Sequence, residues 1–336
     1  MRRIAPHIFS QKEAAMERRQ QIFRVGKVVM LCALVAQLAA PALNWAVKLF
    51  SDPQVAAFLV YMETGRVVRP SAQPLPPSPT QPSVVQTEPP VSRVSFDTKD
   101  SQLIKISNFT GYKPDIGELL TSPLSWNLTG DGPAVLILHT HATESYAGTP
   151  GYRTEDAQRN MLRVGREIAD ILEENGIGVI HDTTLHDQPS YNGSYSYARR
   201  TIQAYLEKYP SICMVLDVHR DALELTEAKQ LNTNAQVDGQ ASAQLMLVMG
   251  TDAGGLYHPN WQENLAVGVK LQALLERQYP GFCRPLQLRT ERFNQDLSAA
   301  GMILEVGAAG DSLEEALVAA GTLARAIVTL SRGTEG

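Results

Sequence analysis

Ala134-Val-Leu-Ile-Leu-His-Thr-His-Ala-Thr-Glu144 joins an uninterrupted apolar run to a cluster of polar side chains. The apolar run from Ala134 to Leu138 predicts a strand that is covered on both faces, as strands in a parallel sheet are. In open α/β sheets, ligands bind beyond the carboxyl ends of the strands. The histidines and the glutamate that follow Leu138 therefore mark a candidate site.

Strands and helices alternate after this segment. Apolar runs predict further strands at residues 177–180, 212–218, 245–249 and 302–306. Helical periodicity predicts helices at residues 156–175, 195–209, 264–279 and 312–331, the last with Ser312 as its N-cap. A short strand at 103–106 and a short helix at 116–120 precede them. This alternation predicts an α/β fold with an open, mostly parallel sheet and helices on both faces.

The N-terminal part has the pattern of a membrane anchor. Residues 1–27 hold seven Lys or Arg against two Glu, and residues 28–47 hold no charged side chain. Twenty such residues suffice to cross a bilayer as a helix, and the basic flank predicts a cytoplasmic N-terminus. The alternative is a cleaved signal peptide, but the basic head is long and no clear cleavage site follows the apolar run.

A proline-rich segment separates this anchor from the folded part. Eight prolines lie between residues 70 and 90, so residues 48–95 are predicted to be an extended, extracytoplasmic spacer. Residues 96–336 are the expected catalytic domain. The net charge of −5 argues against nucleic acid as the main partner, and three cysteines without a C-x-x-C pair argue against a cysteine-based metal site.

The polar cluster has the residue types and spacing of a zinc site. His141 and Glu144 are three positions apart, which is the His-x-x-Glu spacing of zinc carboxypeptidases. His219 follows a second strand, and two His plus one Glu is an established ligand set for catalytic zinc. The residues alone leave open whether His139 or His141 is the first ligand. His139 could instead orient a ligand or contact the substrate.

Other residues are expected to support the metal. A ligating imidazole needs an acceptor for its second nitrogen, and Asp217 and Asp221 flank His219. Glu305 lies in an apolar strand, where a carboxylate is costly to bury, and is the expected general base. Its alternative role is an ion pair with an arginine. The remaining histidines of this part of the chain are interpreted as loop residues: His181, His186 and His258.

These residues together resemble the stage II sporulation protein P family of cell-wall hydrolases from endospore-forming bacteria. The resemblance covers about residue 108 to the end, and the anchor and spacer also fit the layout of that family. Its matching stretches are residues 136–146, 181–191, 217–222, 293–298 and 303–307. Several motifs in the same order make the match specific.

The resemblance implies a zinc-dependent N-acetylmuramoyl-L-alanine amidase fold, related to the phosphorylase/hydrolase-like fold, with Zn²⁺ as cofactor. It implies removal of stem peptides from glycan strands and an endopeptidase activity on cross-links. Alignment with the amidase pattern makes His141 the first ligand, with Glu144 and His219 completing the set and Glu305 as the catalytic Glu. In the broader amidase family the ligand Glu lies farther from the first His than it does here.

The resemblance also implies a setting. The protein would act on peptidoglycan in septal wall thinning and engulfment, between the mother-cell and forespore membranes, with stage II sporulation proteins D and M as partners. Two other functions remain open: a zinc carboxypeptidase on wall peptides, and a non-catalytic wall-binding scaffold.

Wall peptides carry carboxylates, which an arginine can bind through two parallel hydrogen bonds. Arg220 and Arg292 are the expected candidates. Each could instead pair with a neighbouring acid, Asp221 or Asp296. Further residues expected at the cleft are Asn294, Gln295 and Tyr146.

Overall fold

The computed structural model describes residues 94–222, 224–226 and 229–335, all within a unit that spans residues 86–336. The predicted head (1–27), the predicted anchor (28–47) and nearly all of the proline-rich spacer lie outside the described residues. Within the described ranges, no helix has both the length and the apolar composition that crossing a bilayer requires.

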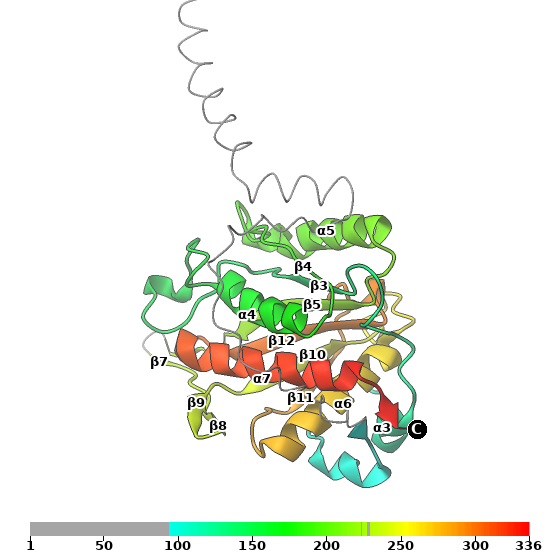
Figure 1. The fold of residues 1–336 in the computed structure, drawn as a ribbon. Helices are drawn as coiled ribbons and strands as arrows, with labels where there is room; N and C mark the ends of the chain where they lie inside the picture. Colours follow the sequence, from blue (N-terminus) through cyan, green and yellow to red (C-terminus); the bar gives the residue numbers. More distant parts are fainter. Residues whose placement is uncertain (1–93, 223, 227–228, 336) are drawn as a thin grey trace, which may run out of the picture. The chain divides into compact units, whose positions relative to one another are not determined.

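A seven-stranded sheet forms the centre of the fold (Figure 1). All neighbouring strands are parallel except one antiparallel pair, β10 and β12, so the predicted mostly parallel sheet is confirmed. In spatial order the strands are β2 (Ile106–Asn108), β11 (Leu286–Arg289), β10 (Leu245–Gly250), β12 (Ala300–Ala308), β5 (Met214–Asp221), β3 (Val135–Leu138) and β4 (Val179–His181). The antiparallel pair joins two parallel blocks, and β12, β5, β3 and β4 end at the same edge.

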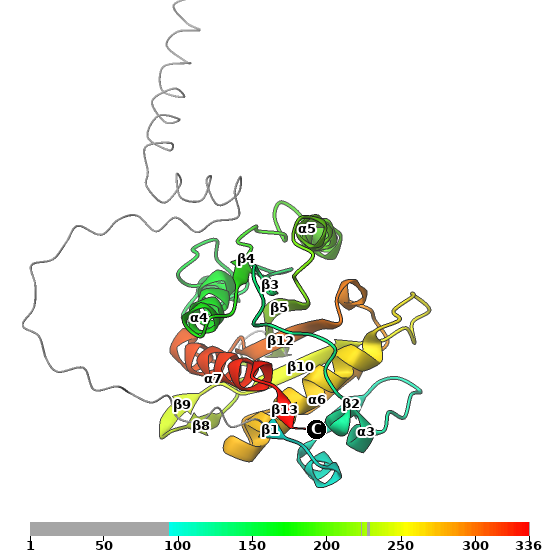
Figure 2. The same cartoon turned by 45° about the vertical axis from the view of Figure 1, so that its right-hand side comes forward.

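Helices cover both faces of this sheet, as predicted. On one face, α4 (Met161–Glu174), α6 (Trp261–Gln278) and α7 (Leu313–Ser331) bury the main apolar core. On the other face, α5 (Ser194–Lys208) packs over β3 and β5 through Ala198 and Ile202 (Figure 2). Among the residues that the structure describes, α5 is the only long helix on that face, so no other described helix covers the ends of β5 and β12 there, and they can hold polar groups.

Short elements complete the described chain, and some differ from the prediction. Residues 103–106 were expected to form a strand, but the Asp97 side chain caps a 3-10 helix that runs to Leu103, so the strand starts at Ile106. β11 and the hairpin β8–β9 were not predicted. The short elements are β1 (Val94–Ser95), η1 (Thr98–Leu103), α3 (Ile116–Thr121), η2 (Pro150–Tyr152), η3 (Tyr191–Gly193), β6 (Glu224–Thr226), β7 (Lys229–Gln230), β8 (Ala235–Val237), β9 (Gln240–Ser242), η4 (Gln295–Leu297) and β13 (Thr334–Glu335).

Local signals fix the ends of the long helices. The expected N-cap Ser312 is confirmed, because its side chain accepts from Glu315 N while Glu315 caps it in return. Helix α4 begins five residues later than predicted, since the Asn160 side chain accepts from Leu162 N and starts the helix there. Gly176, with φ of 80°, follows the end of α4 as predicted.

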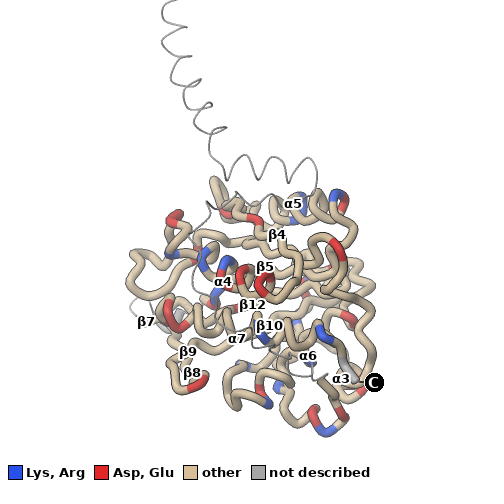
Figure 3. Tube along the Cα trace, viewed as in Figure 1, with Lys and Arg blue, Asp and Glu red and all other residues tan. Residues whose placement is uncertain are grey.

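The outer side of α4 carries charges of both signs, with the arginines in the first half of the helix and the acids after them (Figure 3). Arg163 pairs with Glu167 at 2.9 Å, and Arg166 pairs with Asp170 and, at 3.1 Å, with Glu173. Exposed pairs of this kind contribute only about 0.3–0.5 kcal/mol each. Burial of the inner apolar side therefore holds α4 on the sheet.

Gly165 sets how closely α4 approaches the carboxyl ends of β3 and β4. A methyl group on this glycine would lie 2.5 Å from His139 Nε2 and 2.7 Å from His181 Nε2. His139 is fully buried and its Nε2 is 2.9 Å from His181 Nε2, so the two rings have little room to move. A side chain at position 165 would push α4 away from the sheet.

We therefore expect Gly165→Ala to destabilise the fold by about 1–3 kcal/mol, the usual cost of overpacking a filled core. By helix propensity alone, replacing glycine with alanine would stabilise the helix by about 1 kcal/mol. Chemical denaturation of the wild type and the variant measures the difference.

Gly321→Ala in α7 is the matched control. The nearest atoms to a methyl group there would be the ends of flexible side chains: Arg325 Nη1 and Ile171 Cδ1 at 3.3 Å, and Glu167 Oε1 at 3.8 Å. This variant should be as stable as the wild type or more stable by up to about 1 kcal/mol. Equal stability of the two variants would contradict the packing described for Gly165.

Candidate metal centre

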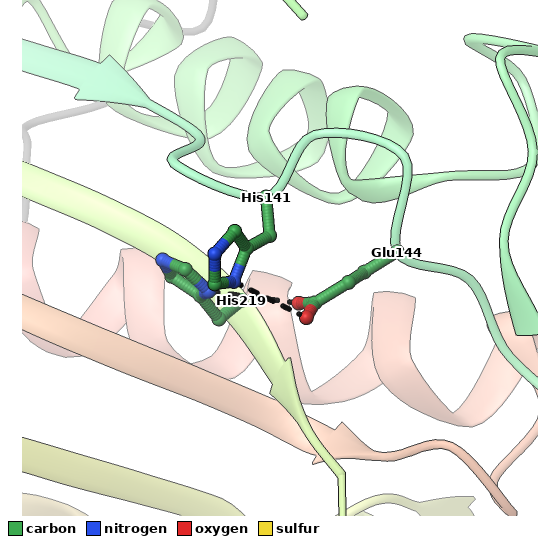
Figure 4. Close-up of side chains that lie close together, drawn as sticks. All are labelled: His141, Glu144 and His219. Carbon is green, nitrogen blue, oxygen red and sulfur yellow. Dashed lines mark ion pairs between the residues drawn. The ribbon is translucent and has the colours of Figure 1, made fainter. Parts of the chain in front are cut away.

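His141, Glu144 and His219 converge at the carboxyl ends of β3 and β5, as Figure 4 shows. The first two lie in the loop that follows β3, and the third lies near the end of β5. β3 and β5 are adjacent and parallel, so their ends meet at one edge. One candidate ligand atom from each residue lies within 4.8 Å of the others, and all three side chains are buried.

Both imidazoles turn the same nitrogen toward the carboxylate. Nδ1 of His141 is 3.5 Å from Glu144 Oε1, and Nδ1 of His219 is 3.5 Å from Glu144 Oε2. The outer nitrogens are also held: His141 Nε2 is 3.1 Å from Ser194 Oγ, and His219 Nε2 is 2.9 Å from Asp217 Oδ1. Partners of this kind fix ring orientation in metal sites. The expected role of Asp217 agrees with this contact.

The ionisation states of Glu144, Asp217 and His219 depend strongly on one another. Burial opposes ionisation of Glu144, but hydrogen bonds from His141 and His219 hold its pKa well below the usual value. Burial likewise opposes ionisation of Asp217, yet the charge and the hydrogen bond of His219 lower its pKa to about 2. The same two carboxylates raise the pKa of His219 well above its ordinary value, against the effect of burial. A ligating imidazole must be neutral, so a metal ion bound here would displace the proton on His219 while taking its place between the two carboxylates.

Two tyrosines border His141. The Tyr191 ring stacks on His141 at 4.3 Å between centroids, and the Tyr195 ring meets it edge-on at 5.6 Å. Tyr191 is half exposed, whereas Tyr195 lies at the start of α5. These rings limit solvent access to one side of the cluster.

Glu305 lies on β12 directly opposite His219 on β5. Its Oε2 is buried and has no hydrogen-bond partner among the described residues. Burial is the main cause that raises its pKa to about 8, and Glu144 and Asp221 add to the effect. No ion pair joins it to an arginine within the described ranges, so the predicted alternative role is not the one observed. An unpartnered carboxyl group beside a candidate metal centre is suited to proton transfer.

His139 does not join the cluster. Its Nδ1 is 3.0 Å from the carbonyl oxygen of Val218, and its Nε2 is 2.9 Å from His181 Nε2. Burial and the neighbouring His181 lower the pKa of His139 to about 3. Of the two histidines that the sequence left open, His141 faces Glu144 and lies in the candidate cluster, whereas His139 faces α4. His181 belongs to this second pair and ends β4 instead of lying in a loop.

Four other expected site residues, Arg220, Asp221, Asn294 and Arg292, have structural contacts. Arg220 is buried, and its guanidinium donates to the carbonyl oxygens of Ser145 and Tyr152 at 2.9 and 3.0 Å, so it braces the loop that carries Glu144. Asp221 was expected near the outer nitrogen of His219, but it pairs with Arg284 at 2.7 Å.

Asn294 donates to the carbonyl oxygen of Tyr195 at 2.9 Å and so supports one wall of the site. Arg292 pairs with Asp296 at 3.2 Å, which is the alternative that the sequence had left open.

Tyr146 and Gln295 were expected to line the cleft, and both are buried instead. The Tyr146 hydroxyl donates to the carbonyl oxygen of Val306 at 2.7 Å. The Gln295 amide bridges Gly250 N and the carbonyl oxygen of Val248 at the far end of β10. These side chains stabilise backbone around the site and do not form its surface.

Sequence reasoning missed several residues that border the centre. Ser194 holds His141, and Arg153 Nη2 lies 3.6 Å from Glu144 Oε1. An isolated backbone bridge pairs Glu144 with Arg153 across the loop, and no sequence pattern indicates this pairing. Asp187 and Tyr191 lie in the motif at residues 181–191, so that motif could have pointed to them.

A family model for stage II sporulation protein P (SpoIIP) matches residues 73–328. The chain belongs to this family. The chain is 28% identical to stage II sporulation protein P of Bacillus subtilis (strain 168) over 203 residues, which cover 56% of this chain and 48% of the relative. The chain therefore spans about half the length of that curated relative.

Two solved structures are similar to part of this chain. One is the N-acetylmuramoyl-L-alanine amidase AmiC2 of Nostoc punctiforme, with 13% identity, a TM-score of 0.34, and coverage of 59% of this chain and 95% of the other. The second is the apo form of the N-acetylmuramyl-L-alanine amidase Ami1 from Mycobacterium abscessus, with 11% identity, a TM-score of 0.32, and coverage of 58% and 95%.

We expect mutations in and around this cluster to weaken zinc binding by different amounts. His219→Ala removes a candidate ligand and should weaken zinc binding by more than about 100-fold. Asp217→Asn keeps all three candidate ligands but removes the charge that orients His219, and should weaken binding by about 10–100-fold. Competition with a zinc-chelating dye measures both affinities.

His258→Gln is the control, because His258 lies outside the cluster and contacts Asn260 at 3.3 Å. It should keep wild-type affinity. If His219→Ala binds zinc as tightly as the wild type while remaining folded by circular dichroism, this cluster is not the metal centre.

Proposed function

We propose that this protein is a zinc-dependent N-acetylmuramoyl-L-alanine amidase that removes stem peptides from the glycan strands of peptidoglycan. The main observation in favour of this function is that two histidines and a glutamate converge next to Glu305. The carboxyl group of Glu305 is buried and has an oxygen without a partner among the described residues. Membership of the stage II sporulation protein P family supports a role in sporulation.

The donor set fits zinc. Two imidazole nitrogens and one carboxylate are a recognised ligand set for catalytic zinc, which leaves a position for water. Calcium and magnesium prefer oxygen ligands, so two inward-facing imidazoles disfavour them. The second nitrogens of both rings already have partners in Ser194 and Asp217, as ligating imidazoles require. Zinc held by His141, Glu144 and His219 would supply Lewis-acid chemistry: it would lower the pKa of a bound water to about 7 and polarise the substrate carbonyl.

Glu305 is the proposed general base and acid. Hydrolysis adds water to the amide carbon, breaks the carbon–nitrogen bond and releases an amine, so one proton must pass from water to nitrogen. Glu305 lies on the strand next to His219 and has an unoccupied carboxyl oxygen to accept that proton and hand it on. A zinc ion held by the three ligands would add positive charge beside Glu305 and so favour the ionised carboxylate that accepts the proton. Burial favours the neutral carboxyl once the proton has been taken up.

The biological setting is part of the same proposal. The catalytic domain, residues 96–336, would lie outside the cytoplasm, held by the anchor at 28–47 and the proline-rich spacer. There it would thin septal wall during engulfment, together with stage II sporulation proteins D and M. An endopeptidase activity on cross-links would use the same centre, since both reactions hydrolyse an amide bond.

Glu305→Gln should reduce release of stem peptides by about 10²–10⁴-fold, the usual contribution of general acid–base catalysis. Zinc content should stay near one ion per chain, because Glu305 is not among the three ligands. Chromatography and mass spectrometry of digested peptidoglycan measure the products, and elemental analysis measures the metal.

Glu174→Gln, at the exposed end of α4, is the matched control and should act as the wild type does. A fully active Glu305→Gln would rule out the assignment of the base. The product also tests the reaction class: an amidase leaves the lactyl carboxylate of muramic acid free, whereas a carboxypeptidase releases single terminal amino acids.

A further inference from the structure

A pocket of about 670 Å³ opens beside the metal centre. Its lining includes Thr143 and Asp187, which are buried, and Tyr191, whose ring covers His141. Arg153 also lines it and is the one basic residue among the described residues that do so. The pocket therefore adjoins Glu144 and His141 without being part of the ligand cluster.

Arg153 is held in place by contacts on one side of its guanidinium. Nη1 donates to Thr143 Oγ1 and to Asp187 Oδ2, each at 3.1 Å. Asp187 is itself fixed, since its Oδ2 also accepts from the backbone nitrogen and hydroxyl of Thr143. The guanidinium lies over the Tyr191 ring at 4.7 Å. An arginine fixed in this way loses little further entropy when it binds a ligand.

The other edge of the Arg153 guanidinium, Nε and Nη2, can still donate hydrogen bonds to a ligand. In the part of the chain that the structure describes, Nε and Nη2 of Arg153 make no hydrogen bond, and the nearest acid to Nη2 is Glu144 at 3.6 Å. The side chain is 38% exposed. The Nε–Nη2 edge is a planar fork that matches the two oxygens of a carboxylate.

The neighbouring arginines do not offer this edge. Arg220 is buried and uses its guanidinium on backbone carbonyls. Arg292 pairs with Asp296 and donates to the carbonyl oxygen of Tyr257. The acids at the pocket leave this edge open. Asp187 pairs with Nη1 at 3.1 Å, on the opposite side of the guanidinium, and Glu155 is exposed to water, which screens its charge.

We propose that Arg153 binds a carboxylate on the peptide half of the substrate and so places the scissile amide beside Glu144 and His141. This inference rests on the proposed amidase function. The chemistry that Arg153 recognises is a peptide carboxylate, which in a stem peptide is either the free α-carboxylate of the γ-linked glutamate or the C-terminal carboxylate. Arg153 is thus a specificity-determining residue, and the pocket at Thr143 and Tyr191 is the peptide subsite.

Peptide binding tests this directly, without any need for cleavage. Titration calorimetry with the purified full-length protein compares three probes: the tripeptide L-alanyl-γ-D-glutamyl-L-lysine, the same peptide with isoglutamine at its second position, and the same peptide with a C-terminal carboxamide. The wild type should bind the tripeptide about 10–100-fold more tightly than one of the two amidated forms, as expected for a charge-assisted bidentate contact. The amidated form that loses affinity identifies which carboxylate is bound.

Arg153→Met should lose this preference and bind all three probes alike, whereas Arg153→Lys should keep a reduced preference. Arg163→Met is the matched control, since Arg163 pairs with Glu167 on α4 and does not line this pocket, and it should discriminate as the wild type does. Zinc content and melting temperature show whether each variant is folded.

Two results would overturn the inference: a wild type that binds all three probes equally, or an Arg153→Met variant that keeps the full preference. If the preference depends on Arg153 but the protein releases no stem peptides from peptidoglycan, the peptide subsite stands and the proposed function fails. If stem peptides are released and Arg153→Met keeps the preference, the function stands and the subsite is wrong.

Discussion

The carboxylate of Asp217 joins the two halves of the candidate metal centre. Its two oxygens accept from the backbone nitrogen and the hydroxyl of Thr140, at 2.8 and 2.6 Å, in the loop that carries His141 and Glu144. Its Oδ1 also lies 2.9 Å from Nε2 of His219, two residues along its own strand. Hydrogen bonds to charged groups of this kind contribute about 1.5–3 kcal/mol each. One buried side chain thus fixes the loop after β3 against the end of β5.

Arg220 completes this arrangement from the other side. It follows His219, its backbone nitrogen donates to Glu144 Oε2 at 3.4 Å, and its side chain holds the backbone of Ser145. Glu144 therefore faces both histidines because β5 supplies contacts at consecutive positions 219 and 220. Arg153 approaches the same carboxylate from the solvent side. The centre depends on strand adjacency, because the loop holds only the short helix η2 and isolated backbone bridges, which could not position these groups alone.

Much of the fold and the residues of the centre could be predicted from the sequence. The apolar runs at β3, β5, β10 and β12 are long enough to mark buried strands, and polar residues at their ends stand out against them. β11 was missed because its four residues alternate in burial and include Gln287 and Arg289. The antiparallel placement of β10 was also not predictable, since the direction of a strand depends on how the chain returns, which local periodicity does not encode.

The choice between His139 and His141 shows where sequence reasoning ends. Alternation along β3 places His139 on the same face as Ile137, toward α4, and Thr140 on the face of Leu138, toward α5. The sequence predicts the alternation but not which face holds the site. Only the packing of α4 through Gly165 shows that His139 is enclosed with His181. Arg153 was missed for a related reason, because a loop arginine has no pattern until the backbone pairing with Glu144 is known.

The most direct test of the account is anomalous diffraction at the zinc edge from crystals of the protein grown with zinc. The account predicts one strong peak per chain, bonded at about 2.0–2.2 Å to Nδ1 of His141, Nδ1 of His219 and a carboxylate oxygen of Glu144. A peak held by His139 and His181, or no peak at these three residues in protein that releases stem peptides, would contradict it.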